Sequence, residues 1–486
     1  MKDHAGWRPF RFFSLIAWLR SFSARIGFGW GRNLRLGDSY RLGSSKVRVP
    51  LAGVPLEISL GLNDRRLHIY PETRLNTRSE ASWLGTFIIV DPRLYLRRIG
   101  GFLRLQPKQS LALGSADATQ QLFFDYPPEV AAQHLVVIYG RDTLAFRSLS
   151  NAGAGIGPAL NQPKSIRIRR LRRLREIFGG PVELLERDEA LRLIHEVNDL
   201  LLAEEYRPRD DRGLPGGLLV LPDHLTPILV ADLHAQVDNL LTVLSQNAFL
   251  DAIEEGSAAL VILGDAAHNE LDGQLREMRG SMLLMDLIFR LKVRFPKQVF
   301  YLRGNHDSFS EDIAKDGIPQ GLLWAKELGE QRGTAYLKAM TEFYRRIPYV
   351  VVSRHFLACH AAAPKSKTSL EMVVQIHRYP ELVPQLINNR LHRANRPQGY
   401  NRRDVKRFRR AFQLTPETPF IVGHTPLDRE GTVWLNVDAI RNHHLLFSAH
   451  PEHVGVFTRI GEAMIPLVYP VDAATAIINA LPAASE

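Results

Sequence analysis

The sequence predicts a mixed α/β protein, in which a β-sandwich over residues 41–160 precedes a larger α/β domain over residues 221–486. Short apolar runs separated by Gly, Pro, Asn and Asp fill the first region, a pattern typical of an all-β sandwich. In the second region, apolar runs that end in polar clusters alternate with helical patterns. A chain of 486 residues is long enough for two or three such domains.

The composition excludes several classes of protein. With 45% hydrophobic and 23% charged residues the chain is globular, which excludes wholesale disorder and a multi-span membrane protein. The single cysteine, Cys359, excludes a disulfide framework and a Cys-rich zinc module. The apolar run Phe12–Leu19 is too short to cross a bilayer. We therefore expect a cytoplasmic protein with no transmembrane segment, with peripheral attachment to a membrane as the alternative.

The chain is basic, and its charge predicts the chemistry of its partners. It has 62 Lys and Arg residues against 51 Asp and Glu residues, a net charge of +11, which favours phosphate-bearing partners or an anionic membrane surface. Residues 1–40 form a segment in which arginines and aromatic residues are interleaved. For this segment we predict a helix docked on the protein's own body, with a membrane surface or nucleic acid as alternative contacts.

Part of the predicted sandwich resembles a forkhead-associated domain, a β-sandwich that reads phosphothreonine. The resemblance rests on Leu111–Ser115, Ala131–His134 and Leu149–Gly153, although Ser115 stands where that family has an arginine and Ala152 splits its Asn-Gly pair. It implies a sandwich, with a phosphopeptide or an anionic surface as candidate partner of the basic N-terminal half. The apolar runs that predict strands here are Val47–Val49, Thr86–Val90, Phe102–Leu105, Leu135–Tyr139 and Leu144–Phe146.

Residues 161–220 are predicted to form a basic helical connector. The run Lys164–Arg175 carries seven Lys and Arg residues interrupted by Ile and Leu. This pattern predicts a partly amphipathic, solvated helix, or else a surface that recruits a polyanion. A second helical pattern covers Asp188–Glu205, and Pro208 with the glycine-rich residues 213–217 ends it.

The C-terminal region contains five apolar runs that each end in residues of metal-ligand type. Buried strands of α/β domains have such continuous apolar runs, and ligands gather at the carboxyl ends of strands. Five such ends therefore predict one shared site, and helical patterns over Asn239–Phe249 and Met282–Val293 would cover the sheet faces. The five clusters are Asp232-Leu233-His234, Gly264-Asp265, Arg303-Gly304-Asn305-His306-Asp307, His360 and Gly423-His424-Thr425-Pro426.

The residue types in these clusters agree with a transition-metal site. Carboxylates and imidazoles suit Mn, Fe or Zn, and an asparagine carbonyl completes a shell without adding charge. Two ions about 3.5–4 Å apart can share a bridging carboxylate, activate water and hold a phosphoryl oxygen. We therefore expect two divalent metal ions, with manganese as the first candidate.

In this order the clusters resemble the calcineurin-like metallophosphoesterase superfamily over about half of the chain, and most closely its phosphoprotein (Ser/Thr) phosphatase branch. Leu302–His306 and Cys359–Pro364 carry the likeness to that branch. The resemblance implies a four-layer α-β-β-α sandwich with a dinuclear centre. It also implies that Asp232 and His234 hold the first ion, that the catalytic Asp265 bridges both ions, that Asn305, His360 and His424 hold the second ion, and that His306 is the catalytic general acid.

The second motif departs from that branch. Where the branch has Gly-Asp-x-x-Asp-Arg-Gly, this chain has Gly264-Asp265-Ala266-Ala267-His268-Asn269-Glu270. His268 replaces the carboxylate that pairs with the general acid, and Asn269 replaces an arginine that holds phosphate. Asp307 is an alternative support for His306, and guanidinium groups elsewhere in the chain suit phosphate oxygens. We predict substrate contacts from Arg303, His268, Asn269 and Arg402.

These observations predict a metal-dependent phosphatase that hydrolyses phosphomonoesters, with phosphoserine and phosphothreonine in proteins as candidate substrates, by attack of a metal-bound hydroxide. Cys359 lacks the Gly-rich, Arg-ended loop of a cysteine phosphatase, so no phosphoenzyme is expected. Two alternatives stay open. The same centre could act on a nucleotide, a dinucleoside polyphosphate or a nucleic-acid end, or the chain could be a catalytically degenerate scaffold that binds phosphopeptides.

Overall fold

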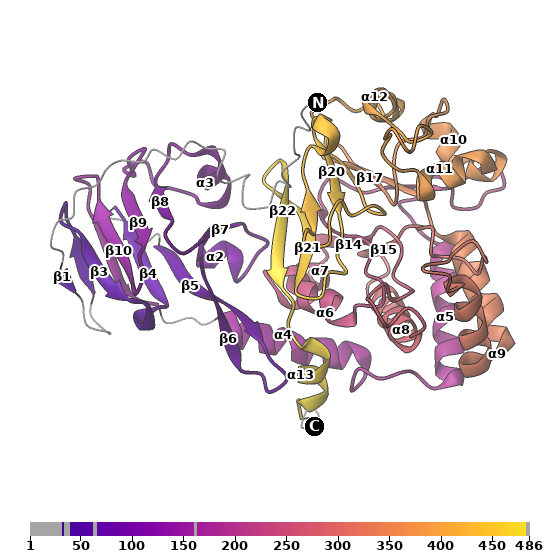
Figure 1. Cartoon of the computed structure of the whole chain (residues 1–486), viewed down its shortest axis with the longest axis horizontal. Coiled ribbons are helices and arrows are strands. Elements are labelled where there is room, and N and C mark those ends of the chain that lie inside the picture. Colours follow the sequence, from indigo (N-terminus) through magenta and orange to yellow (C-terminus); the bar gives the residue numbers. More distant parts are fainter. Residues whose placement is uncertain (1–31, 34–38, 62–65, 160–162, 483–486) are drawn as a thin grey trace, which may run out of the picture.

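The computed structural model describes residues 32–33, 39–61, 66–159 and 163–482. They form two lobes, a β-sandwich at one end and a larger α/β lobe at the other (Figure 1). The helix predicted within residues 1–40 lies outside the described residues. Of this segment the structure describes residues 32–33, which form the two-residue strand β1 (Arg32–Asn33), and residues 39–40. Among the helices that the structure describes, none is long and apolar enough to span a bilayer.

The N-terminal lobe is the predicted β-sandwich. Inward side chains of its two sheets, such as Ile58, Ile89 and Phe146, share one core, because successive side chains of a strand point to opposite faces. The first sheet has the order β1, β3 (Val47–Pro50), β10 (Thr143–Ser148), β9 (Leu135–Tyr139), β8 (Ser110–Leu113). The second has the order β2 (Tyr40–Leu42), β11 (Ala154–Pro158), β4 (Leu56–Leu60), β5 (Arg66–Leu75), β6 (Ala81–Val90), β7 (Phe102–Leu105), and the short helices are η1 (Leu51–Gly53), α2 (Pro92–Tyr95) and α3 (Ala118–Phe123).

The three stretches that resemble a forkhead-associated domain meet around the buried ring of His134. Its Nε2–H donates to the Gly153 carbonyl at 2.7 Å, and its Nδ1 accepts the Ala131 N–H at 3.1 Å. These bonds join two loops of the sandwich, so His134 has a structural role. Phosphopeptide recognition by this lobe stays a prediction.

The larger lobe contains two further sheets, each made of sequentially distant strands. In the first of these, β13, β14 and β15 are parallel. Its order is β15 (Val299–Tyr301), β14 (Ala258–Ile262), β13 (Thr226–Val230), β21 (His453–Ile460), β22 (Ala463–Pro470). The other has the order β12 (Leu218–Val220), β16 (Val350–Val352), β17 (Leu357–Cys359), β18 (Phe420–Val422), β20 (His443–Leu446), β19 (Val433–Trp434).

Three cores separate four layers in this lobe, which confirms the predicted α-β-β-α sandwich. Ile228 and Val230 of β13 pack against helices, whereas Leu229 between them packs in a core shared with Val351 and Ile421 of the other sheet. The outer face of that second sheet packs against helices through a third core. Helices on the first sheet are α4 (Pro163–Phe178), α5 (Arg187–Leu202), α6 (Val237–Ser245), α7 (Phe249–Glu254), α8 (Arg279–Arg294), α9 (Gln320–Arg346) and α13 (Ala474–Ala480). Those on the second are α10 (Leu370–Val374), α11 (Val383–Asn388) and α12 (Arg402–Ala411), with the short turns η2 (Ile376–Arg378), η3 (Pro380–Leu382) and η4 (Val437–Ala439) nearby.

One predicted helix is wrong in its extent. The pattern over Asn239–Phe249 predicts one continuous helix, but α6 ends at Ser245 and α7 begins at Phe249. Between them Asn247 adopts a left-handed backbone, with φ of 50°. Its side-chain amide exchanges two hydrogen bonds with the backbone of Gly100 in the sandwich, at 2.7 and 3.0 Å. The break therefore serves a contact between the lobes that local periodicity does not encode.

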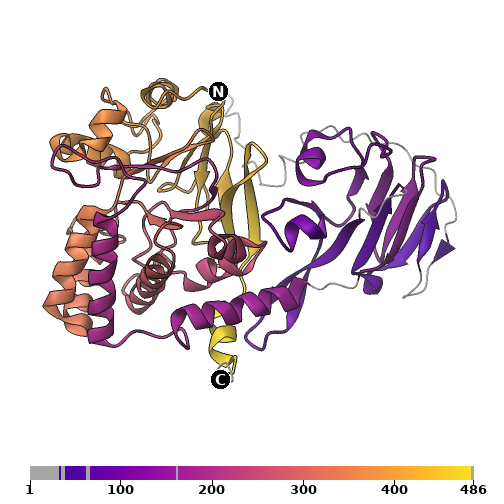
Figure 2. The ribbon, with the colours of Figure 1, turned by 180° about the vertical axis from the view of Figure 1, so that it is seen from behind.

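The basic helix α4 is the main connection between the lobes and lies along the base of the α/β lobe (Figure 2). The guanidinium of Arg167 binds the carboxylate of Asp472, and that of Arg170 binds Asp251 at 2.7 Å. Asp472 also accepts the N–H of Leu75 from β5, at 2.8 Å. The cations of this predicted connector are thus used to join the lobes.

We expect the Arg167–Asp472 pair to be essential for stability. Asp472 is only 1% exposed, so Arg167→Met would leave a buried carboxylate without its cation and lower the free energy of unfolding by about 3–5 kcal/mol. Arg169→Met on the exposed side of the same helix is the matched control, with an expected change below about 0.5 kcal/mol. Urea denaturation followed by circular dichroism measures both, and equal stability of the two variants would contradict the assignment.

Candidate metal centre

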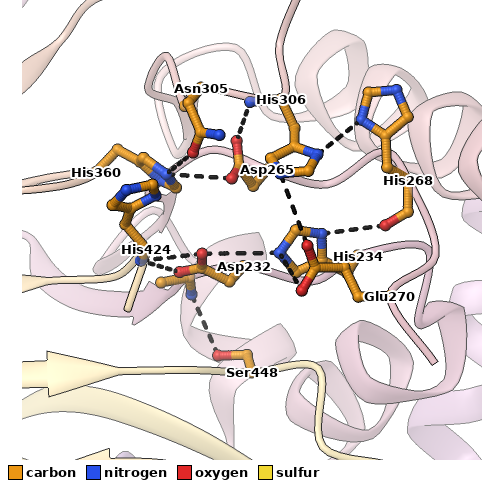
Figure 3. A network of polar contacts seen from close by, with 12 residues as sticks. Asp232, His234, Asp265, His268, Glu270, Asn305, His306, His360, His424 and Ser448 are labelled. Carbon is orange, nitrogen blue, oxygen red and sulfur yellow. Dashed lines mark hydrogen bonds and ion pairs between the residues drawn. The ribbon is translucent and has the colours of Figure 1, made fainter. Parts of the chain in front are cut away.

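The predicted ligands converge at the carboxyl ends of strands from both sheets of the α/β lobe (Figure 3). The first sheet contributes the residues after β13, β14 and β15, and the second contributes the residues after β17 and β18. In chain order these residues are Asp232 and His234 after β13, Asp265 after β14, Asn305 and His306 after β15, His360 after β17 and His424 after β18.

Several of these residues have a left-handed backbone, which is costly for residues other than glycine. The φ angles are 52° at Asp232, 54° at Asp265 and 69° at His424. Such conformations persist only where the surroundings enforce them, and they cluster at functional sites. Here the carboxylate of Asp232 accepts the N–H of His424 with both oxygens, at 3.0 and 2.9 Å. The strain at two ligands is therefore held by a direct bond between them.

Two glycines make room for the carboxylates. A Cβ atom at Gly423 would overlap the carboxylate of Asp232, and one at Gly304 would overlap that of Asp265. Glycine is therefore required at both positions because another side chain would displace the aspartate. The glycines of the two sequence motifs act by leaving space for these carboxylates.

The residues form two ligand groups that share Asp265. The donor atoms of Asp232, His234 and Asp265 lie within 4.8 Å of one another, and so do those of Asp265, His360 and His424. Nε2 of His360 lies 3.1 Å from Asp265 Oδ2 and 2.9 Å from the side-chain oxygen of Asn305. All six predicted ligands are thus brought together.

The orientation of the imidazoles fits divalent metal ions. Nδ1 of His234 bonds to the carbonyl of His268 at 3.1 Å, and Nδ1 of His360 bonds to that of Leu263 at 2.8 Å. A carbonyl that fixes one ring nitrogen and directs the other inward is the usual support of a metal-binding histidine. Nε2 of His424 is buried without a hydrogen-bond partner among the described residues. The donor set of carboxylates, imidazoles and one amide suits Mn, Fe or Zn.

The electrostatics of the cluster also favour a cation. Burial raises the pKa of Asp232 to about 6. Burial opposes protonation of His360, but Asp265 and Asp232 outweigh it and raise the pKa of His360 to about 9. Without metal, Asp232 and His360 therefore bind protons more readily than free side chains do. A metal ion would have to displace these protons, as is common for metal ligands.

Asp307 organises the loops and does not support His306. Its carboxylate accepts the hydroxyl of Tyr301 at 2.7 Å, the N–H of Gly304 at 2.7 Å and the N–H of Asp265 at 3.3 Å. Burial and the nearby Asp265 raise the pKa of Asp307 to about 6. The residue fixes the ends of β14 and β15 relative to each other.

His306 instead contacts His268. The two Nδ1 atoms are 3.0 Å apart, and the ring of His268 is fully buried beside Trp324. The backbone N–H of His306 donates to Asp265 Oδ1 at 2.8 Å. The histidine that replaces the usual carboxylate is thus the direct partner of the predicted general acid.

The other predicted substrate residues make contacts outside the cluster. The guanidinium of Arg303 donates to the carbonyl of Tyr344 and lies over its ring. The amide of Asn269 donates to Gln274 at 2.8 Å and accepts the N–H of Leu271 at 3.0 Å within its own loop. Arg402 is exposed at the start of α12. Substrate binding by these three residues stays a prediction.

Three charged residues near the cluster were missed by the sequence motifs. Glu270 lies 3.9 Å from His234 Nε2, 3.7 Å from His306 Nε2 and 3.0 Å from Lys315 Nζ. Asp232, Asp265 and Glu270 all act electrostatically on the guanidinium of Arg390. Glu270 occupies the last position of the second motif, where the phosphatase branch has glycine, which was an available signal, whereas Lys315 and Arg390 lie in loops with no motif.

Comparison with known families agrees with this geometry. Residues 225–451 match the family model of the calcineurin-like phosphoesterases. This part of the chain is therefore a calcineurin-like phosphoesterase domain, and the protein is a metal-dependent hydrolase of phosphoesters. The resemblance seen in the sequence motifs is confirmed at the level of the family. No curated protein matches the chain.

Solved structures similar to the chain include two phosphatases at low identity. One is a protein serine/threonine phosphatase from Saccharomyces cerevisiae, itself described as similar to human phosphatase PP5, with 15% identity and a TM-score of 0.44 over 59% of this chain and 90% of that chain. The other is a cold-active protein-tyrosine phosphatase from a psychrophilic Shewanella, with 14% identity and a TM-score of 0.35 over 52% of this chain and 82% of that chain.

The contact between Gly423 and Asp232 predicts a specific loss of metal binding. Gly423→Ala would push the Asp232 carboxylate out of the cluster, so we expect the affinity for Mn²⁺ to fall at least about tenfold. Gly329→Ala in α9 meets nothing within 4 Å and is the matched control. Isothermal titration calorimetry measures the affinities, and an unchanged Mn²⁺ affinity in Gly423→Ala would contradict the steric argument.

Proposed function

We propose that the protein hydrolyses phosphomonoesters at a centre of two divalent metal ions. The observation that carries the proposal is that Asp265 belongs to both ligand groups, since a carboxylate has two oxygens and can serve two ions at once. Ions held there would supply Lewis acidity toward a phosphoryl group and toward water. Manganese is the ion to test first, because the donor set contains no thiolate.

His306 is the proposed general acid, and His268 the residue that sets its tautomer. One of the two facing Nδ1 atoms must donate to the other. If His306 donated, His268 would carry its proton on Nε2, which is buried and has no partner among the described residues. A buried N–H without an acceptor is costly, so His268 is assigned as the donor. His306 then carries a proton on Nε2, the nitrogen nearest Glu270, from which it can protonate a leaving alkoxide.

Arg390 is the proposed phosphate-binding residue. The carboxylates of Asp232, Asp265 and Glu270 attract its guanidinium electrostatically. The guanidinium donates one long hydrogen bond, of 3.4 Å, to Thr425 Oγ1. Burial lowers the pKa of Arg390, but an arginine stays charged in proteins. Most of its five donor hydrogens are therefore left for the oxygens of a bound phosphate, which a guanidinium binds in pairs.

Two substrate classes fit this centre. The motif resemblance favours phosphoserine and phosphothreonine in proteins, and the net charge of +11 favours nucleotides or nucleic-acid ends. Activity of any kind distinguishes both from a degenerate phosphopeptide-binding scaffold. Manganese-loaded protein is expected to cleave p-nitrophenyl phosphate, and Asp265→Asn is expected to abolish both cleavage and the binding of two ions.

We expect His306→Ala to discriminate between leaving groups. An alkyl phosphate needs a proton on its leaving oxygen, so kcat for this substrate should fall by about 10²–10⁴. The p-nitrophenolate ion leaves without a proton, so kcat for p-nitrophenyl phosphate should fall much less. Steady-state kinetics with matched metal loading measures both values. An equal loss on both substrates would show that His306 is not the acid.

Removal of the Arg390 guanidinium should weaken phosphate binding. Arg390→Ala is expected to lower kcat/KM for p-nitrophenyl phosphate by about 10–100-fold and to raise the inhibition constant of inorganic phosphate, because a charge-assisted pair is worth about 1.5–3 kcal/mol. Arg441→Ala is the control. Arg441 is 71% exposed and precedes β20, which is parallel to β18, so it lies at the amino ends of these strands and the metal centre lies at their carboxyl ends. Equal kinetics for the two variants would leave Arg390 without a role in binding.

A further inference from the structure

A strongly basic insertion leads into the metal centre. Residues 364–411 contain twelve Lys and Arg residues against three Asp and Glu residues, a balance of +9, whereas the whole chain carries +11. The insertion lies between β17 and β18, the strands that lead to His360 and His424. Its charge therefore acts on whatever approaches the centre.

Helix α12 in this insertion presents its cations to solvent. Val405 and Phe408 on its inner face pack in the core against the second sheet. The one acidic residue of the helix, Asp404, is buried and bound to Asn401 and Arg407. The outer face carries four exposed cations that make no side-chain hydrogen bond or ion pair to any described residue. They are Arg402, Arg403, Lys406 and Arg410.

The other basic helix of the chain is different. On α4, Arg167, Arg170 and Arg173 are engaged with carboxylates of the α/β lobe, and of its exposed residues only Arg169 and Arg172 are cations without a side-chain partner among the described residues. The sequence assigned anionic partners to the N-terminal half, but within the described residues α12 presents more unpaired exposed cations, four of them, than α4 does. A row of cations without counter-ions is unfavourable by self-repulsion unless a polyanion binds to it.

The helix is bonded at two points to segments that lead to the metal centre. The N–H of Tyr400 donates to the carbonyl of Arg390 at 2.9 Å, and Asn401 then caps α12. In the middle of the helix, Arg407 donates to the carbonyl of Pro364 at 3.2 Å, four residues after His360. Helix α12 lies with α10 and α11 on the outer side of the second sheet (Figure 1).

We propose that the exposed face of α12 binds the phosphate backbone of a single-stranded nucleic acid whose terminal phosphate is hydrolysed at the metal centre. This inference rests on the proposed phosphomonoesterase activity and names its substrate class. Arg402, Lys406 and Arg410 follow at intervals of four residues, so they form one stripe with a rise of about 6 Å per step. A repeating anion can pair with such a stripe.

A nucleic acid fits the arrangement better than an acidic phosphopeptide. In a nucleic acid the group that is cleaved and the groups that dock on the stripe are the same phosphate chemistry at regular intervals, whereas a peptide needs a separate acidic run. Arginine, which dominates the insertion, binds phosphate oxygens in pairs.

The test compares two triple variants that remove the same charge. Arg402→Ala/Lys406→Ala/Arg410→Ala removes the stripe, and alanine preserves the helix. Lys326→Ala/Lys338→Ala/Arg345→Ala removes three exposed cations from α9 and is the matched control. Fluorescence anisotropy with a 12-nucleotide oligothymidylate between 50 and 200 mM salt measures affinity, and kcat/KM is measured on the same oligonucleotide with a 5′-phosphate. Lys406→Glu is a second variant in case the triple variant folds poorly.

The expected result is a loss of affinity of at least about tenfold in the α12 variant, with the slope of log K against log salt reduced by about 2, since each contact with a single strand contributes about 0.7. kcat/KM on the phosphorylated oligonucleotide should fall in parallel, and the α9 variant should behave as wild type. Equal effects of the two triple variants, or none, would overturn the proposal. Dependence of an acidic phosphopeptide alone on the α12 cations would overturn it in favour of a protein partner.

Failure of the proposed function gives a different pattern. Wild-type protein that cleaves p-nitrophenyl phosphate but neither binds nor cleaves the oligonucleotide would retain the phosphatase proposal and reject the nucleic-acid surface. Wild-type protein that binds the oligonucleotide through α12 but cleaves no phosphomonoester would reject the phosphatase proposal and, with it, the assignment of the terminal phosphate as substrate.

Discussion

The arrangement of the α/β lobe depends on the carboxylate of Asp265. It accepts the N–H of His306 from the loop after β15 and contacts Nε2 of His360 from the other sheet. It also completes the group formed with Asp232 and His234 after β13. One side chain thus connects loops from both sheets at the edge where they meet. A negative charge at 1% exposure is tolerable only with cationic partners, and this need explains why imidazoles surround it.

The sequence predicted the strands and the ligands of this lobe because both are local signals. Each ligand directly follows an apolar run, and parallel strands place such positions along one edge. The runs ending at Ala231, Leu263, Leu302, Cys359 and Val422 all lie on or next to strands of the structure. Periodicity could not predict that two sheets share the site, because the apolar pattern of one strand does not identify the strand that pairs with it.

The residues that sequence patterns missed come close to the site only through the tertiary fold. Glu270 and Lys315 are 45 positions apart and form an ion pair of 3.0 Å beside His234, and Arg390 belongs to a loop without a motif. The break between α6 and α7 has the same origin, because Asn247 leaves the helix to bind Gly100. Likewise, Arg303 stands beside the motif in sequence, but its side chain turns to Tyr344. Adjacency in sequence fixes the position of the backbone and leaves open the direction of a long side chain.

The contacts of Asp472 have a consequence for biosynthesis. This residue lies 14 positions before the last residue of the sequence, yet it binds Leu75 of the sandwich, Arg167 of the connecting helix and Thr242 of α6. During translation the sandwich and α4 emerge long before their partner exists. Arg167 therefore has no carboxylate partner until Asp472, 305 positions later in the chain, has been synthesised, so this ion pair between the lobes can form only after all the described strands have been translated.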